Sequence, residues 1–223
     1  TRLQGDWSSD VCSSDLHGKS WQFLATPATG TQTIKEAWQE GATIANQNLI
    51  SGYGTQITSN NGGSQAGAEA LGFDVYTPTG PSMKVFSSLG AWNGVANTNI
   101  PIYNQKGYMV FVRGDRSVTT FNAPATATTL RTRGKLFVPA SNPIPTSFIP
   151  AGKFEAIGNP HASAVDFSYF DKTDYPDVDN AFYVWDPLLV GTYGYGGYQL
   201  IAAVNGDFLP TPGGTINYPT GVP

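Results

Sequence analysis

The sequence predicts an all-β fold, sandwich-like or barrel-like, with two diverged half-repeats and one short helix near residues 33–40. Turn-forming residues are frequent, with 26 glycines and 16 prolines, which disfavours a helical bundle. Charged residues make up 13% of the chain and aromatic residues another 13%, so it is too apolar for a disordered protein. Short runs of aromatic and β-branched residues lie between the turn residues, a pattern typical of strands.

The central strand of this prediction is the apolar run Tyr108–Val112, which lies between two glycines. Alternate side chains of a strand point to opposite faces, so Tyr108, Val110 and Val112 would share one face. The remaining two side chains are apolar as well, and we therefore expect both faces of the strand to be covered. Further strands are expected at Ser20–Ala25, Gly54–Thr58, Phe73–Tyr76, Ser82–Phe86 and within Thr128–Val138.

A capping box predicts where the helix begins. Thr33 and Glu36 have the spacing at which the threonine hydroxyl accepts a hydrogen bond from the Glu36 amide while the glutamate reaches back. Gly41 is well placed as a left-handed helix stop. We expect this to be the only helix.

The N-terminal stretch Asp6–Leu16 resembles the translation of a sequencing-adapter oligonucleotide over all of its residues. Residues 1–16 are therefore interpreted as an assembly artefact in a metagenomic fragment and are excluded from the prediction of the fold. Their exclusion removes Cys12, the only cysteine, so the rest of the chain is expected to form no internal disulfide.

Two pairs of similar segments suggest an internal repeat. Trp21–Pro27 and Phe154–Pro160 share an order of aromatic, polar, apolar and proline residues, and Met83–Phe86 corresponds to Phe182–Trp185. The predicted organisation is a first β half-repeat over 17–139, a proline-rich linker over 140–152 and a truncated second half-repeat over 153–223. The alternative is a chance likeness of strands that end at a proline.

Charge and hydropathy exclude several classes of partner. The net charge is −4 and there is no run of basic residues, so we expect no binding to nucleic acid. No apolar run approaches the roughly 18 residues of a membrane helix, so no membrane insertion is expected. The tripeptide Arg113–Asp115 matches an integrin-binding motif, but we expect it to be a framework feature at a strand end, where Arg116 pairs with Asp115.

Signatures of catalysis are poor. The two histidines, His17 and His161, offer little for a catalytic triad, and Gly62–Ala66 lacks the second glycine of a nucleophile elbow. We therefore predict that the chain is not an enzyme. A pair of glycosidase carboxylates is a spatial arrangement that the sequence alone does not reveal.

Two candidate ligand sites lie in the second half of the chain. Asp177 and Asp179 are the best pair for Ca²⁺ in an acidic loop, although the spacing does not fit an EF-hand, and the alternative is a solvated loop. Tyr193, Tyr195 and Tyr198 alternate with glycines, and their rings could form a platform for a glycan or simply pack a sheet. No other cofactor is expected.

The ordered motifs together resemble a known family. Trp21–Pro27, then Gly107–Ser117, then Phe154–Pro160 followed by Phe182–Pro187 are similar to a β-rich module of large secreted Bacteroidota proteins, which usually end in a sorting domain for type IX secretion. The resemblance covers nearly all of the chain after residue 17. It departs from the family pattern at His161, where members more often have an aromatic residue.

The resemblance implies an extracellular or outer-cell-surface location and no catalytic residues. It implies a non-catalytic, structural or adhesion-type module whose partners are neighbouring domains of the same polypeptide. A glycan or a surface protein is a further candidate partner. The alternative functions are a glycan-binding module and an accessory domain of an extracellular hydrolase.

Overall fold

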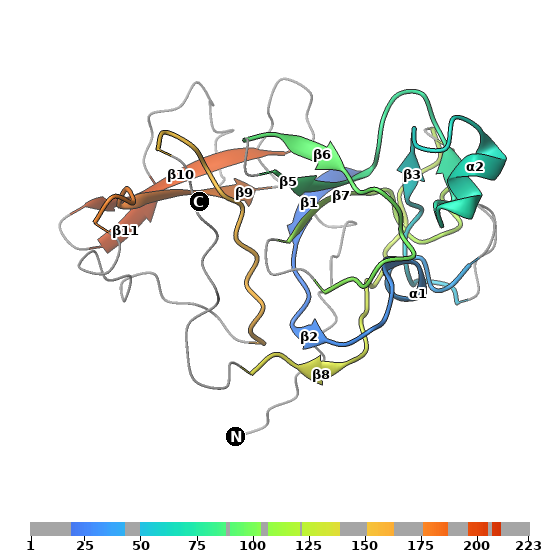
Figure 1. The fold of residues 1–223 in the computed structure, drawn as a ribbon, viewed down its shortest axis with the longest axis horizontal. Helices are drawn as coiled ribbons and strands as arrows, with labels where there is room; N and C mark the ends of the chain where they lie inside the picture. The colour runs from blue at the N-terminus through green and yellow to red at the C-terminus, as the bar shows by residue number, and fades with distance from the viewer. Residues whose placement is uncertain are drawn as a thin grey trace. The chain divides into compact units, whose positions relative to one another are not determined.

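The computed structural model describes residues 19–42, 50–87, 90–103, 107–120, 122–138, 151–162, 176–186, 196–204 and 207–210. These residues form a mainly β fold with several antiparallel sheets and two short helices (Figure 1). The chain divides into two compact units, Thr1–Ala162 and Ser163–Pro223. The boundary between the units thus follows Ala162, whereas the sequence placed it in the proline-rich segment 140–152.

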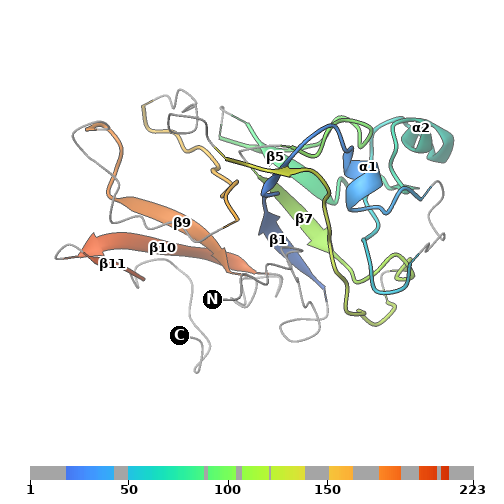
Figure 2. The same cartoon turned by 90° about the horizontal axis from the view of Figure 1, so that it is seen from below.

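The main sheet of the first unit has four antiparallel strands in the order β1-β7-β5-β6 (Figure 2). The strands predicted around residues 20, 83 and 108 are confirmed, and β6 follows β5 as a hairpin partner. Among the described strands, β1 and β6 are the edges of an open sheet, so these strands do not form the barrel-like alternative. The four strands span Ser20–Leu24 (β1), Met83–Phe86 (β5), Trp92–Gly94 (β6) and Tyr108–Val112 (β7).

Strand β7 is covered on both faces, as its sequence predicts. Val110 and Val112 have no exposed surface, and Tyr108 on the same face packs edge-to-face against Trp38. On the other face the Phe111 ring lies 5.4 Å from the ring of Trp21 on β1. Apolar residues on both faces make β7 an inner strand with β1 and β5 as its neighbours.

Helix α1, Ile34–Ala37, confirms the capping box. The Thr33 hydroxyl accepts a hydrogen bond from the Glu36 amide at 3.1 Å, and the Glu36 carboxylate accepts one from the Thr33 amide at 2.8 Å. The amide of Ile34 donates to the Ile100 carbonyl, so the first turn is also tied to the loop before β7. Gly41 is left-handed as predicted, with a φ of 70°, but the helix already ends at Ala37, and Glu40 before Gly41 is left-handed as well, with a φ of 54°.

The expectation of a single helix is wrong, because a second helix, α2, spans Gln65–Ala70. The Ser64 side chain caps it by accepting a hydrogen bond from the Gly67 amide at 3.1 Å. Three alanines favour the helical conformation. The helix has only six residues and is flanked by glycines, so its sequence shows no apolar periodicity.

Two further ribbons of two residues per strand complete the first unit. The antiparallel pair consists of β2, Ala28–Thr29, and β8, Lys135–Leu136. The parallel pair consists of β3, Thr58–Ser59, and β4, Val75–Tyr76. β4 and β8 lie within expected strands but are shorter, β3 shares only Thr58 with the strand expected over Gly54–Thr58, and β2 was not expected.

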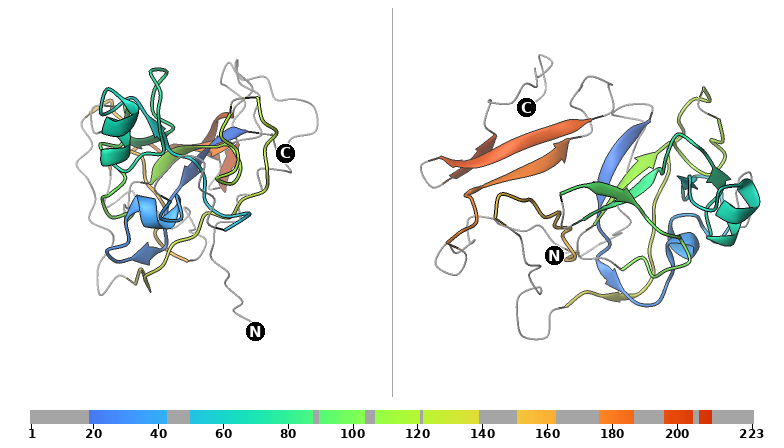
Figure 3. Two further views of the ribbon diagram at one scale, coloured as in Figure 1. Left: turned by 90° about the vertical axis from the view of Figure 1, so that its right-hand side faces the viewer. Right: turned by 45° about the horizontal axis from the view of Figure 1, so that its top comes forward.

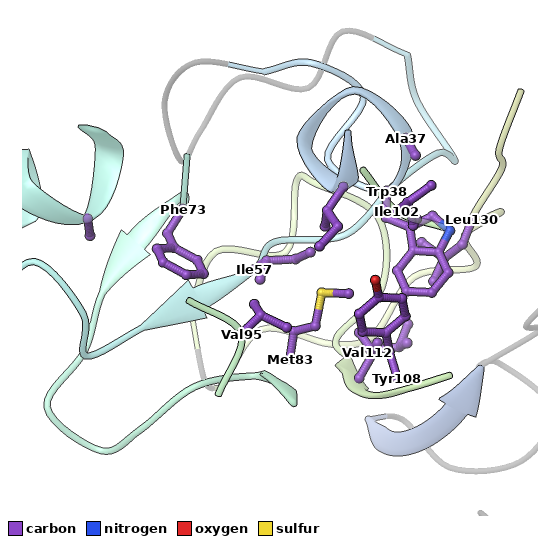
Figure 4. Packing of buried hydrophobic residues seen from close by; sticks show 13 residues of the cluster. Ala37, Trp38, Ile57, Phe73, Met83, Val95, Ile102, Tyr108, Val112 and Leu130 are labelled. Atoms are coloured by element: carbon purple, nitrogen blue, oxygen red, sulfur yellow. The ribbon is translucent and has the colours of Figure 1, made fainter. Parts of the chain in front are cut away.

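The apolar core lies between the inner face of the main sheet, helix α1 and the loops beside α2 (Figure 4). All the buried hydrophobic residues of the described chain lie in the first unit. None of the helices in the described ranges has the length and apolar character needed to cross a membrane. The core cluster consists of Ile34, Ala37, Trp38, Ile57, Ala68, Phe73, Met83, Val95, Ile102, Tyr108, Val110, Val112 and Leu130.

The second unit contains one three-stranded antiparallel sheet in the order β11-β10-β9 (Figure 3). Its strands are β9, Ala181–Asp186, β10, Gly197–Val204, and β11, Asp207–Pro210. β10 is the inner strand and pairs with both neighbours. β9 contains Phe182–Trp185, the segment that the sequence compares with Met83–Phe86.

Candidate functional site

An aromatic cluster lies on one face of the sheet in the second unit. The register of the sheet sets Tyr198 of β10 opposite Trp185 of β9, and Tyr183 lies on the same face of β9 as Trp185. The Tyr198 ring is 4.9 Å from the Trp185 ring and 6.3 Å from the Tyr183 ring, and both contacts are edge-to-face. Strand alternation therefore gathers three aromatic side chains into one cluster, which we call the aromatic face.

A glycine makes room for the tryptophan of this face. Gly196 has a φ of 107°, and a Cβ atom there would lie 2.5 Å from the Trp185 ring. The indole therefore lies directly against the backbone just before β10. A side chain at this position would displace the ring.

The aromatic face is partly open to solvent. Tyr183 is 51% exposed, and Trp185 and Tyr198 are half-buried. Tyrosine and tryptophan combine an apolar ring with a polar group, which suits a surface that contacts both apolar and hydrogen-bonding parts of a ligand. On the opposite face of the same sheet, Phe182 packs against Phe208 with ring centres 5.4 Å apart.

Only part of the predicted glycan platform can be placed. Tyr198 belongs to the aromatic face, whereas Tyr193 and Tyr195 lie outside the described residues. The sequence did not single out Tyr183 and Trp185 as site residues. The register between β9 and β10 would identify these two residues as part of the site. The sequence alone does not determine this register.

The predicted calcium ligands Asp177 and Asp179 lie in an exposed turn before β9. The described residues include no group of three or more histidine, cysteine, aspartate or glutamate side chains arranged to hold a metal ion. The other acidic positions of this loop, Asp171 and Asp174, lie outside the described residues. The described turn thus provides two solvated carboxylates.

The buried charges of the first unit form a pair that the sequence did not predict. The Arg116 guanidinium donates to both carboxylate oxygens of Asp74, at 2.6 and 2.8 Å, and both side chains have almost no exposed surface. Asp74 also accepts a hydrogen bond from the Ile57 amide at 2.8 Å. Burial raises the pKa of Asp74, while the hydrogen bonds and positive charge of Arg116 act in the opposite direction.

The expected pairing of Arg116 with Asp115 is therefore wrong, because Arg116 turns inward to Asp74. The Asp115 carboxylate instead accepts hydrogen bonds from neighbouring groups, and Asp115 is only 5% exposed. Its carboxylate accepts hydrogen bonds from the amides of Gly52 and Ser117 and from the Ser117 hydroxyl. The tripeptide Arg113–Asp115 is thus part of the framework at the end of β7, with its carboxylate engaged.

These hydrogen bonds change the acidity of Asp115. Burial alone would raise the pKa of this carboxyl group. The hydrogen bonds donated by Ser117 and Gly52 outweigh burial, and the pKa lies below its ordinary value. Asp115 is therefore held as a carboxylate that bridges the loop at Gly52 and the turn after β7.

A third charged contact joins the turn after helix α1 to the segment before β8. Arg131 donates to the Glu40 carboxylate at 2.7 Å, and its guanidinium lies 4.1 Å from the centre of the Tyr53 ring. The hydrogen bond with Glu40 is the main reason that the pKa of Arg131 is raised. The contact cross-links segments that are far apart in the sequence.

A second group of aromatic residues, which the sequence did not identify as a group, lies on the outer face of the main sheet. Its ring contacts join Phe23 to Trp92 at 5.4 Å and Trp92 to Phe86 at 5.2 Å. Lys84 lies 4.8 Å from the centre of the Trp21 ring on the same face. All five residues are half-buried, so they indicate packing more than an open binding surface.

Comparisons with models of known families, with curated proteins and with solved structures found no match to this chain.

Proposed function

We propose that the chain is a non-catalytic structural module of a large secreted or cell-surface bacterial protein. The observation that carries this proposal is the use of charged groups as internal cross-links. Asp74 pairs with Arg116 in the core, and Asp115 binds two backbone amides. Groups that hold loops in this way stabilise a framework and are not placed to receive a substrate.

The remaining parts of the proposal rest on the resemblance in the sequence. The parent protein would be a Bacteroidota protein exported by type IX secretion and exposed on the outer cell surface or in the medium. The module would present neighbouring adhesive or binding domains of the same polypeptide. Its fold would be a sandwich of two diverged half-repeats, with β5 and β9 in corresponding positions.

The structural role is tested with purified residues 17–223 and a panel of chromogenic glycosides, esters and peptides. The expected result is no turnover with any substrate. Turnover that a variant of one carboxylate abolishes, without loss of folding, would contradict the non-catalytic proposal.

The cellular part of the proposal requires a separate experiment on the full-length reading frame. Protease treatment of intact cells that express the parent protein should cleave it from the surface. Cleavage only after lysis would contradict a surface location. A reading frame without a sorting domain would remove type IX secretion from the proposal.

A second candidate function, glycan binding, is favoured by the aromatic face of the second unit. Tyr183, Trp185 and Tyr198 are adjacent on one face of the sheet, and all three are partly exposed, so their rings are accessible to a sugar. Rings of this kind bind the apolar face of a sugar while their polar atoms hydrogen-bond its hydroxyl groups.

Titration with a glycan panel, followed by tryptophan fluorescence, tests this function. A bound glycan should change the Trp185 signal, and Trp185→Ala should abolish the binding when it is measured by isothermal titration calorimetry. Phe208→Ala is the matched control, because it removes an aromatic ring from the opposite face of the same sheet. Equal losses in the two variants would indicate a damaged sheet and would contradict a site at the aromatic face.

A further inference from the structure

A basin in the first unit lies where the β2–β8 ribbon meets the start of helix α1. Its volume is about 730 Å³, and it opens widely to solvent. It is lined by Thr31, Gln32 and Glu36 on one side and by Arg133, Gly134 and Lys135 on the other. A volume of this size accommodates a small organic ligand.

Glycines in the lining let the two walls of the basin approach each other closely. A Cβ atom at Gly134 would lie 2.4 Å from the Thr29 carbonyl oxygen, so the two chains approach backbone to backbone. Gly30 lies opposite Gly134, and a Cβ atom there would have only backbone atoms near it, at 3.8 Å or more.

The basin offers mainly hydrogen-bond donors. Arg133 and Lys135 are exposed, and within the described residues neither side chain has a hydrogen bond, although the Arg133 charge attracts the Glu36 carboxylate of the same lining. Gln32 uses its side-chain oxygen to accept the Arg133 amide at 2.6 Å, which leaves the NH₂ group of Gln32 as a donor. Arg133, Lys135 and Gln32 all line the basin.

The one acidic residue of the lining is already engaged. The Glu36 carboxylate accepts hydrogen bonds from the amide and the hydroxyl of Thr33 at the start of helix α1. Its charge therefore serves the capping box. The two cations exceed the single carboxylate, so the basin carries a net positive charge in a chain whose net charge is −4.

We propose that this basin binds an acidic sugar unit of a polysaccharide through its carboxylate group. The guanidinium of Arg133 and the ammonium of Lys135 supply charge-assisted hydrogen bonds to the carboxylate. Gln32 and Thr31 provide polar groups for the sugar hydroxyls. The volume greatly exceeds that of an inorganic anion, and the wide opening lets a polymer continue on both sides.

Binding of polygalacturonate, measured by isothermal titration calorimetry at low ionic strength, tests the proposal. Arg133→Gln and Lys135→Gln should each weaken binding about tenfold, the loss expected when a hydrogen bond to a charged group is removed. Added salt should weaken binding further. Lys153→Gln is the matched control, since it removes one exposed charge outside the basin and should leave binding unchanged.

Three further ligands distinguish the outcomes. Dextran, which is neutral, and inorganic phosphate should not bind, while a sulfated polysaccharide tests whether a carboxylate is preferred. Equal binding of dextran, equal or tighter binding of the sulfated polymer, or an equal loss in Lys153→Gln would each overturn the proposal. The basin variants alter only the first unit, so their failure leaves glycan binding at the aromatic face untouched.

Discussion

At the scale of single residues, the Asp74–Arg116 pair is a buried ion pair with a large desolvation cost. Two opposite charges are removed from water, and each is compensated mainly by the other, with further hydrogen bonds to Asp74 from the Ile57 amide and the Gln39 side chain. Such a pair gives little net stability compared with an apolar pair, but the loss of one partner leaves a buried charge without compensation.

Arg116→Ala should therefore lower the free energy of unfolding by about 3–5 kcal/mol, as measured by urea denaturation. Arg133→Ala is the control, because this exposed arginine should change the value by less than about 0.5 kcal/mol. The double variant Asp74→Leu/Arg116→Met should recover much of the loss. A double variant as unstable as Arg116→Ala alone would argue against an uncompensated charge as the cause.

The lowered pKa of Asp115 predicts a pH dependence of stability. The unfolded chain has a carboxyl pKa of about 3.9 at this residue, and the folded pKa is lower, so the unfolded state binds the proton first. The stabilisation is complete above the unfolded pKa and is lost as pH falls through the folded pKa. Asp115→Asn should therefore reduce the fall in melting temperature on acidification.

Asp177→Asn, which removes an exposed carboxylate, is the control for this measurement. Its melting temperature should follow that of the unaltered protein from neutral pH to about pH 3. If Asp115→Asn also followed that curve, the hydrogen bonds from Gly52 and Ser117 would not stabilise the carboxylate form.

At the scale of elements, a glycine inside helix α2 illustrates how packing overrides helix propensity. Alanine normally stabilises a helix interior by about 1 kcal/mol relative to glycine. A Cβ atom at Gly67 would lie 2.1 Å from the Gly62 carbonyl oxygen, because the loop before the helix folds back onto it. The close backbone approach therefore favours glycine over alanine at position 67.

Gly67→Ala should consequently destabilise the protein, despite the better helix propensity of alanine. The expected loss is about 1–3 kcal/mol in urea denaturation, the cost typical of overpacking. Gly30→Ala is the matched control, since its nearest neighbours would lie at ordinary van der Waals distances and its φ is not in the left-handed region. A gain in stability from Gly67→Ala would show that the loop at Gly62 can move away.

Structural features that depend on residues close together in the sequence could be predicted from it. Features that depend on contacts between distant residues could not. The capping box of α1 and the apolar run of β7 each lie within a few residues, and both predictions were confirmed. The partner of Arg116 is Asp74, more than forty positions earlier, and only the folded chain brings the two together. The Trp185–Tyr198 contact likewise depends on strand register.

At the scale of the whole molecule, the two units differ in how much they bury. The first unit contains the whole described apolar core, whereas in the sheet of the second unit the largest aromatic side chains remain half-buried or exposed. Apolar burial is the main favourable contribution to folding, so the local stability of the two sheets should differ.

Hydrogen exchange with mass spectrometry at increasing urea tests this difference. Peptides that contain β9 and β10 should lose protection at a lower urea concentration than peptides that contain β1 and β7. Addition of a glycan that binds the aromatic face should raise the midpoint of β9 and β10 alone. Identical midpoints without ligand would show that both units unfold as one cooperative structure.

The pairing of β1 with β7 has a consequence for the synthesis of the protein. Ser20 lies opposite Val112, so the main sheet cannot close until most of the first unit has left the ribosome. Contacts between such distant positions slow folding, because a long loop must close before the contact forms. During that interval the aromatic residues of β1 are exposed on an unpaired strand, and a chaperone that covers Trp21 and Phe23 would protect the nascent chain from aggregation.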